Sequence, residues 1–262
     1  MGHGTRDPEG MAEFVGYAEA LRNRSGEPVF PGVLEFPSQT VGDIQAAFDA
    51  AAEAGLDQLL AVPALLFFAG HTQDDMPGQI ELAKARHPDM RITLAGPLGS
   101  DERLLEVLEE RLAPFEPDED TAVLLVGRGS LHPSANADLF RTARMLWDRN
   151  RYGWVEAGFV SLAPPDVAAG IERCARLGAK RVVAIPYFLN TGVLVKRIAQ
   201  QAFHPSVEVQ VAPHLGVHPL VVEAMLDRLR QAREGDCPCI AAQGCRIPSL
   251  SCTRGDRCLL PV

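Results

Sequence analysis

The chain has 262 residues, which is enough for one large domain or for two of about 125 residues each. Hydrophobic residues make up 47% and charged residues 23%, an ordinary balance for a globular protein. A net charge of −9 argues against general binding to nucleic acid, and no apolar run reaches the ~20 residues of a membrane span. The start resembles no signal peptide, so we expect a cytoplasmic protein without nucleic-acid or membrane partners.

The first 113 residues alternate short apolar runs with longer helical patterns. The chain opens with "MGHGTRD", continues through the apolar runs "GVLEF" (32–36) and "LLAVPALLFF" (59–68), and reaches the helical pattern "DERLLEVLEERL" (101–112). Only two residues precede His3, too few for a strand. Loss of a central strand would expose core residues to water. We therefore expect the natural chain to begin upstream of Met1.

A Pro- and acid-rich stretch, "PFEPDED" (114–120), predicts a linker. Beyond it, β-rich runs predict four strands: "TAVLLVG" (121–127), "GWVEAGFVSL" (153–162), "RVVAIPYFL" (181–189) and "VEVQVAP" (207–213). Amphipathic segments predict helices near 135–150, 165–177, 192–203 and 217–232.

The two halves are copies of one unit. "LAGPLGSDERLLEVLEERL" (94–112) aligns with "VAPHLGVHPLVVEAMLDRL" (211–229) at a constant offset of 117 residues, and the "HP" pairs at 87–88 and 204–205 keep that offset. We therefore predict an N-terminal domain over 1–113, the linker over 114–120, a C-terminal domain over 121–232 and a cysteine-rich tail over 233–262. Nearly continuous apolar strands between helices predict an α/β fold: two similar domains, each a small parallel sheet flanked by helices.

Three candidate ligands follow strands of the first copy. His3 follows the position of the missing strand, Glu35 ends "VLEF", and His71 follows "LLAVPALLFFAG". The carboxyl ends of parallel strands meet at one edge, where α/β sheets bind ligands. Two imidazoles and a carboxylate suit a borderline divalent metal such as Co, Ni, Zn or Fe, and they can also accept protons. The alternative for Glu35 is a solvated carboxylate.

The second copy has lost this set. Its equivalent positions are Arg128, Ser161 and Val193. The duplicated scaffold is retained while only one half keeps the metal-binding residues, and this difference is the main functional signal in the sequence.

The motifs "GHGTRDPEG", "LEFPSQT" and "VPALLFFAGHTQDDMP" resemble those of class II tetrapyrrole chelatases, most of all sirohydrochlorin cobaltochelatases of the CbiX type. The resemblance covers about residues 1–232. It implies two related α/β domains with a cleft between them, insertion of Co²⁺ into sirohydrochlorin during cobalamin synthesis, and metal handling by His3 and His71 with Glu35 as acidic partner. A runner-up is the same reaction with Fe²⁺, giving siroheme. A metal carrier or sensor without catalysis is an alternative from another class.

The implied substrate carries eight carboxylates. Arg6, Arg128, Lys196 and Arg197 are candidates to bind them. The reaction needs no nucleotide, and the sequence has no G-x-x-x-x-G-K-[ST] phosphate loop.

The tail contains five of the six cysteines: Cys237, Cys239, Cys245, Cys252 and Cys258. Thiolates suit Zn²⁺ or an iron–sulfur cluster, but the spacing matches no common site. The alternatives are a cluster with a redox partner, a zinc site, and a thiol-rich tail without metal.

We expect structural roles for several other residues that could also have chemical functions. Asp7 precedes Pro8 and is expected to cap a helix. Cys174 lies in a helical pattern and is expected to be buried. The remaining histidines are expected to have structural roles, although three of them are secondary candidates for substrate binding: His132, His214 and His218.

Overall fold

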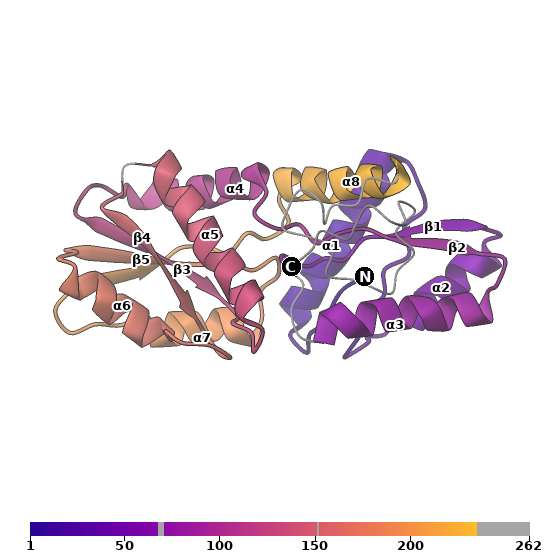
Figure 1. Cartoon of the computed structure of the whole chain (residues 1–262), viewed down its shortest axis with the longest axis horizontal. Coiled ribbons are helices and arrows are strands. Elements are labelled where there is room, and N and C mark those ends of the chain that lie inside the picture. Colours follow the sequence, from indigo (N-terminus) through magenta and orange to yellow (C-terminus); the bar gives the residue numbers. More distant parts are fainter. Residues whose placement is uncertain (68–70, 151, 235–262) are drawn as a thin grey trace, which may run out of the picture. The chain divides into compact units, whose positions relative to one another are not determined.

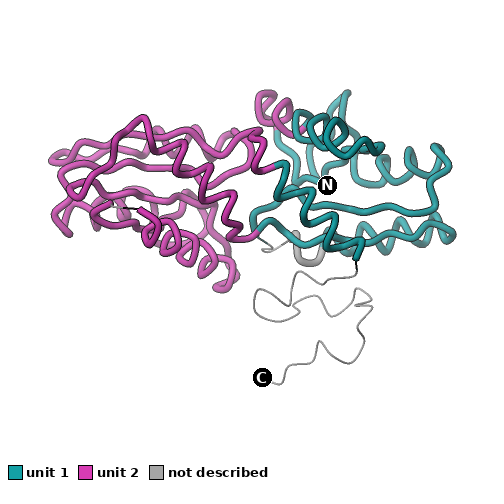
Figure 2. Tube along the Cα trace, turned by 90° about the horizontal axis from the view of Figure 1, so that it is seen from above, with its two compact units in different colours: residues 1–5, 15–98, 222–262 teal, residues 6–14, 99–221 magenta. Residues whose placement is uncertain are grey.

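The structure is a computed structural model and describes residues 1–67, 71–150 and 152–234. The described chain forms two compact units (Figure 2). Unit 1 comprises residues 1–5, 15–98 and 222–234, and unit 2 comprises residues 6–14 and 99–221. Within the described residues, no helix is both long and apolar enough to cross a bilayer.

Unit 2 is built around a four-stranded parallel sheet with strand order β4-β3-β5-β6 (Figure 1). Its strands are β3 (Thr121–Gly127), β4 (Trp154–Phe159), β5 (Arg181–Pro186) and β6 (Glu208–Val211). Each lies inside a run predicted from the sequence. All seven residues of the central strand β3 are buried, because helices cover both faces of the sheet. These helices include α5 (Pro133–Arg149), α6 (Val167–Arg176) and α7 (Val193–Gln201).

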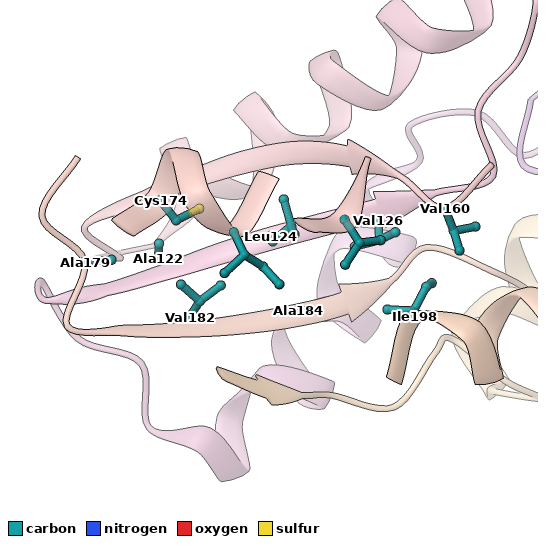
Figure 3. Packing of buried hydrophobic residues seen from close by; sticks show 11 residues of the cluster. Ala122, Leu124, Val126, Val160, Cys174, Ala179, Val182, Ala184 and Ile198 are labelled. Atoms are coloured by element: carbon teal, nitrogen blue, oxygen red, sulfur yellow. The ribbon is translucent and has the colours of Figure 1, made fainter. Parts of the chain in front are cut away.

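One core cluster of unit 2 joins the sheet to α6 and α7 (Figure 3). Leu124 and Val182 of the sheet pack with Ile171 and Cys174 of α6 and with Ile198 of α7, and all five side chains are fully buried. Burial raises the pKa of the Cys174 thiol to about 12. Cys174 is therefore the buried apolar residue that the helical pattern predicted.

The first repeat has the same order of segments with fewer regular strands. Strand β1 (Gln58–Ala61) pairs in parallel with β2 (Arg91–Leu94), and α2 (Ile44–Glu53) and α3 (His71–Arg86) belong to the same repeat. Residues 1–3 lie between two other segments: Gly2 forms a parallel bridge with Val33, and the amide of Ala64 donates to the carbonyl of Met1. Residues 1–3 therefore make the hydrogen bonds that the carboxyl end of a first strand would make.

These bonds recur in the second repeat. The amide of Leu34 donates to the Gly2 carbonyl at 2.9 Å, and the equivalent Val160 donates to Gly127 at 2.9 Å. The Ala64–Met1 bond has its counterpart between Tyr187 and Val126, and both measure 2.8 Å. The predicted internal repeat is confirmed at the level of the backbone.

The helix starts repeat as well. Helix α2 is capped by Asp43, whose carboxylate accepts from the amide of Ala46 at 2.8 Å. Helix α6 is capped in the same way by Asp166, which accepts from Ala169 at 2.8 Å. Each cap satisfies an amide that the first helical turn leaves without a backbone partner.

The last helix of each repeat belongs to the compact unit of the other repeat. Arg111 of α4 (Glu102–Leu112) donates to the carbonyls of His214 and Leu215 at 3.2 and 2.8 Å. Arg228 of α8 (Pro219–Glu234) donates to the equivalent carbonyls of Pro97 and Leu98 at 3.0 and 2.7 Å. The compact units therefore do not follow the predicted boundaries at 113 and 121, which remain a prediction about the repeats.

The helix α1 (Pro8–Ser25) is also shared, since its residues up to Phe14 belong to unit 2 and the rest to unit 1. The predicted linker begins inside a short 3-10 helix, η1 (Ala113–Phe115).

Candidate functional site

Two predicted ligands, His3 and Glu35, lie side by side at the carboxyl edge of the first repeat. The amide of Glu35 donates to the carbonyl of His3 at 2.8 Å. The His3 side chain is half-buried, and that of Glu35 is exposed. The parallel bridge between Gly2 and Val33 sets this register, so the two candidate residues lie next to each other on neighbouring segments.

Gly4 allows this close approach. Its φ is +93°, and a Cβ atom at this position would lie 1.8 Å from the carbonyl oxygen of Glu35. Only glycine, which has no Cβ and tolerates positive φ, permits this backbone contact. The glycine after His3 is thus required by the geometry of the candidate site.

His71 is the first residue of α3. Its chain arrives from β1, the strand whose extension pairs with Met1. The backbone of His71 therefore follows the segment next to residues 1–3, as the sequence predicted. The His71 side chain lies outside the described residues, so its distance to His3 or Glu35 stays a prediction.

The side chains predicted at this edge determine which metal ions it could bind. Imidazole nitrogens and a carboxylate oxygen together suit borderline divalent ions such as Co²⁺ and Fe²⁺. Among the described side chains, no three from His, Cys, Asp and Glu are close enough to hold an ion. His3 and Glu35 thus supply two donors, and the third donor of the predicted set is His71.

The matching edge of the second repeat lacks such donors at the equivalent positions. Arg128 and Ser161 are exposed, and Val193 is 61% exposed at the start of α7. The backbone nevertheless repeats: Gly129 has a φ of +85°, and its Cβ would approach the amide of Leu162 to 3.0 Å. The two edges share a scaffold and differ in their side chains.

Lys196, one of the four predicted carboxylate-binding residues, lies against two carboxylates of the protein. Its ammonium lies 2.7 Å from Asp7 and 2.9 Å from Glu9. The hydrogen bond from Lys196 holds the pKa of Asp7 below its usual range, and the same bond raises the pKa of Lys196. The side chains of Arg6 and Arg197 are exposed.

Asp7 also caps α1, as the sequence predicted. Its Oδ1 accepts from the amides of Glu9 at 3.1 Å and Gly10 at 3.4 Å. Asp7 therefore has a structural function, stabilising both the helix start and its contact with Lys196.

A second group of contacts, which the sequence did not indicate, holds the first part of α1 (residues 8–14) in unit 2. Glu13 accepts a hydrogen bond from the amide of Thr191 and lies 3.0 Å from Nε2 of His214. Asn190 donates to the carbonyl of Gly10 at 3.0 Å. Glu13 and His214 are 201 positions apart, so no local pattern could have paired them.

The secondary histidine candidates have structural partners. His214 is half-buried against Glu13, and His218 lies 3.0 Å from Glu110. His132 is the N-cap residue of α5 and is exposed. The five tail cysteines lie outside the described residues.

The sequence matches the CbiX family over residues 1–114 and 122–232. It is 35% identical over 249 residues to a sirohydrochlorin cobaltochelatase of Priestia megaterium, covering 90% of this chain and 79% of that protein. It is 32% identical over 222 residues to a sirohydrochlorin ferrochelatase of the same organism, covering 82% of each. The sirohydrochlorin chelatase SirB from Bacillus subtilis subspecies spizizenii, solved in complex with cobalt, superimposes with a TM-score of 0.74 at 27% identity, over 89% of this chain and 93% of SirB. The chain therefore belongs to the CbiX family.

Proposed function

We propose that this protein is a metal chelatase that inserts Co²⁺ into sirohydrochlorin on the route to cobalamin, without nucleotide. The family match and the cobaltochelatase and chelatase relatives support this activity. The observation that carries it is the difference between the two repeats. One carboxyl edge presents His3 and Glu35, joined through the backbone at 2.8 Å, while the equivalent edge presents Arg128 and Ser161.

The residues of the first edge have two tasks in this reaction. Insertion must remove water from Co²⁺, present the ion to the macrocycle and take up two pyrrole protons. His3 and His71 bind the metal through the free nitrogen of neutral imidazoles, and the same nitrogen can take up a pyrrole proton once it has released the ion to the macrocycle. Glu35 adds a carboxylate that balances the charge of the divalent ion and offers a second proton acceptor. Gly4 keeps Glu35 beside His3 during these steps.

Binding of the macrocycle is assigned to the basic residues. We assign the substrate carboxylates to Arg6, Arg128 and Arg197, whose side chains are exposed. Lys196 is half-exposed in its pair with Asp7 and Glu9. The side chain of Glu9 is 70% exposed and that of Asp7 only 7%, so Lys196 can exchange Glu9 for a substrate carboxylate at little cost while it keeps its bond to Asp7.

Iron is the second candidate metal, because one relative acts as a sirohydrochlorin ferrochelatase. A donor set of two imidazoles and a carboxylate does not discriminate between Fe²⁺ and Co²⁺ by affinity alone. A metal carrier or sensor would bind the ion at the same edge without transferring it to a macrocycle. The cytoplasmic setting and a cluster or zinc site at the tail cysteines, with a redox partner for a cluster, remain part of the proposal on sequence grounds.

An insertion assay tests the function. Purified protein, sirohydrochlorin and Co²⁺, Fe²⁺, Ni²⁺ or Zn²⁺ are mixed anaerobically, and insertion is followed by absorption spectroscopy. We expect insertion of Co²⁺ at a rate well above the reaction without protein. Faster insertion of Fe²⁺ would favour the ferrochelatase, and metal binding without insertion would favour the carrier.

Two variants test the site. His3→Ala and His71→Ala should abolish insertion while the fold persists, because both residues follow strands at the sheet edge. His204→Ala is the matched control, since its imidazole pairs with Glu172 at 2.9 Å at the far end of α7. Full insertion activity in His3→Ala or His71→Ala would contradict the assignment.

A further inference from the structure

A polar side chain near the start of α2 binds α3 within unit 1. The side-chain nitrogen Nε2 of Gln45 donates to the main-chain carbonyl of Gln79 at 2.8 Å and to the side-chain oxygen Oε1 of the same residue at 2.7 Å. The side-chain oxygen of Gln45 is buried and has no hydrogen-bond partner among the described residues. A buried oxygen without a partner lowers stability, so the presence of glutamine here needs a reason other than stability.

The attachment of α2 to α3 does not depend on Gln45. Ile44 and Phe48 of α2 belong to the same buried apolar cluster as Ile80 of α3. At the other end of the two helices, Asp49 of α2 lies 2.7 Å from Nε2 of His87, the residue that follows α3. Apolar packing and this pair already hold the helices together.

The second repeat joins its equivalent helices without such a glutamine. A carboxylate–histidine pair is present there too, between Glu172 of α6 and His204 after α7, at 2.9 Å. Counted from the cap residue of each helix, the position of Gln45 is taken by Ala168, which has no polar side-chain atom. The glutamine therefore occurs in the repeat that has the predicted metal residues and is absent from the repeat that has lost them.

Gln45 binds α3 directly after a weak point in that helix. Pro77 lies inside α3 and has no N–H, so one helical hydrogen bond is missing. Gly78 follows, although its φ is not positive and an added Cβ would meet nothing within 4 Å, so the fold does not require glycine there. Glycine weakens a helix further. The first turn of α3, which starts at His71, is thus joined by a weakened segment to Gln79, the residue that Gln45 holds.

The corresponding helix of the second repeat, α7, contains neither proline nor glycine. The weak point, like the glutamine, accompanies the histidine at the start of the helix. Both features are missing where Val193 takes the place of His71.

The helix that carries Gln45 is also fixed to the segment of Glu35. The amide of Ile44, the first residue of α2, donates to the carbonyl of Val33 at 3.2 Å. Val33 lies two residues before Glu35, and all of these residues belong to unit 1. Gln45 therefore connects the segment of Glu35 to the helix that begins at His71.

We infer that Gln45 is a positioning residue for the metal site, which holds the start of α3, and with it His71, in place relative to Glu35. The inference rests on the proposed function and deepens it. In this role Gln45 binds no metal itself and limits how far the two donors can move apart. Groups that orient metal ligands without touching the ion typically change metal affinity 10- to 100-fold.

Calorimetric titration of the full chain with Co²⁺ tests the inference. Gln45→Met keeps an unbranched side chain of similar size but cannot donate a hydrogen bond. Binding that persists in His3→Ala is subtracted, so that only the site at the sheet edge is counted. We expect Gln45→Met to raise the Co²⁺ dissociation constant about tenfold. Gln79→Ala keeps the main-chain acceptor and should give a smaller increase.

The same variants are compared in the insertion assay. At Co²⁺ concentrations below saturation, insertion by Gln45→Met should fall by about the factor by which the affinity falls. The KM for sirohydrochlorin should not change, because Gln45 acts on the metal ligands alone.

Glu172→Met is the matched control. It removes a side-chain bond between the equivalent helices of the second repeat, the 2.9 Å contact with His204. Both Glu172→Met and Gln45→Met should unfold at lower urea concentration than the unmodified protein. Only Gln45→Met should lose Co²⁺ affinity, and a residue that merely supports the fold would not produce this difference.

The failure of this inference differs from that of the proposed function. If the unmodified protein inserts Co²⁺ and Gln45→Met binds Co²⁺ with normal affinity, the positioning role is overturned and the activity stands. If the unmodified protein binds Co²⁺ without inserting it, the activity fails, and weaker Co²⁺ binding by Gln45→Met alone would still support the positioning role. Equal losses of Co²⁺ affinity in Gln45→Met and Glu172→Met would show an effect of stability and overturn the inference.

Discussion

Replacement of Gly4 by alanine should move His3 and Glu35 apart, the two described residues of the proposed metal site. Gly4 has a φ of +93°, and its added Cβ would lie 1.8 Å from the Glu35 oxygen. Since Cβ atoms essentially never approach closer than 3.0 Å, the two segments must move apart by about 1.2 Å. A displacement of about 1 Å at a catalytic site can reduce the rate about 100-fold, and we expect a loss of insertion of that size.

The effect on stability has two parts. Left-handed backbone costs an alanine about 1–2 kcal/mol, and loss of the 2.8 Å bond between Glu35 and His3 costs about 1 kcal/mol. Gly4→Ala should therefore lower the free energy of unfolding by about 2–3 kcal/mol. Gly26→Ala is the matched control, because Gly26 has a φ of +70° but nothing within 4 Å of an added Cβ. The control should show the backbone cost alone.

Urea unfolding and the insertion assay test these two predicted effects of Gly4→Ala. We expect Gly26→Ala to keep full insertion with a modest loss of stability, and Gly4→Ala to lose both. A Gly4→Ala protein that unfolds like the Gly26→Ala control and inserts Co²⁺ at the normal rate would refute the argument that the Gly4 contact sets the site.

Three further predictions concern other parts of the chain. Arg128→His should not create a second Co²⁺ site, because Ser161 and Val193 supply no further donor of this kind; equilibrium dialysis finding two ions per chain would contradict this. Asp7→Asn should lower the free energy of unfolding at pH values above the ordinary carboxyl pKa near 3.9. The difference from the unmodified protein, measured by urea unfolding at several pH values, should vanish as the pH falls through the lowered pKa of Asp7. A difference that persists at low pH would show that the charge of Asp7 is not responsible. A chain ending at residue 234 should still insert Co²⁺ but should lack any iron, sulfide or zinc that the full chain carries, as measured by metal and sulfide analysis; loss of insertion with an intact fold would give the tail a catalytic function.

The internal repeat made much of the fold accessible to sequence analysis. The strand β3 was predicted correctly to the residue, since its seven apolar and small residues form a buried central strand between polar flanks. The helix cap at Asp7 and the burial of Cys174 were also predicted correctly, because a cap depends on the residues that follow it and the spacing of apolar residues in a helix indicates its buried face. Local chemistry determines such features, and it is visible in a short window of sequence.

The parts that could not be predicted depend on residues far apart in the chain. Arg111 binds carbonyls more than 100 positions away, and Glu13 lies against His214. The last helix of each repeat belongs to the compact unit of the other repeat, and Lys196 lies beside Asp7. No local pattern in the sequence predicts either arrangement. The metal site of His3, Glu35 and His71 stays a prediction, made because these residues follow strands whose parallel order the sequence implied.

The proposed roles of the two sheet edges would explain why only the first repeat has the histidine pair. A macrocycle receives one metal ion, so a second ion at Arg128, Ser161 and Val193 would contribute nothing to insertion, whereas a surface that holds the macrocycle would. If the first edge handles the metal and the second holds the substrate, changes at His3 and Arg128 act on different binding steps. Residues that share no partner usually give additive effects, within about 0.3–0.5 kcal/mol. The double variant His3→Ala/Arg128→Met should therefore combine the metal affinity of one single variant with the sirohydrochlorin affinity of the other, and strong coupling between the two affinities would mean that both edges bind the same ligand.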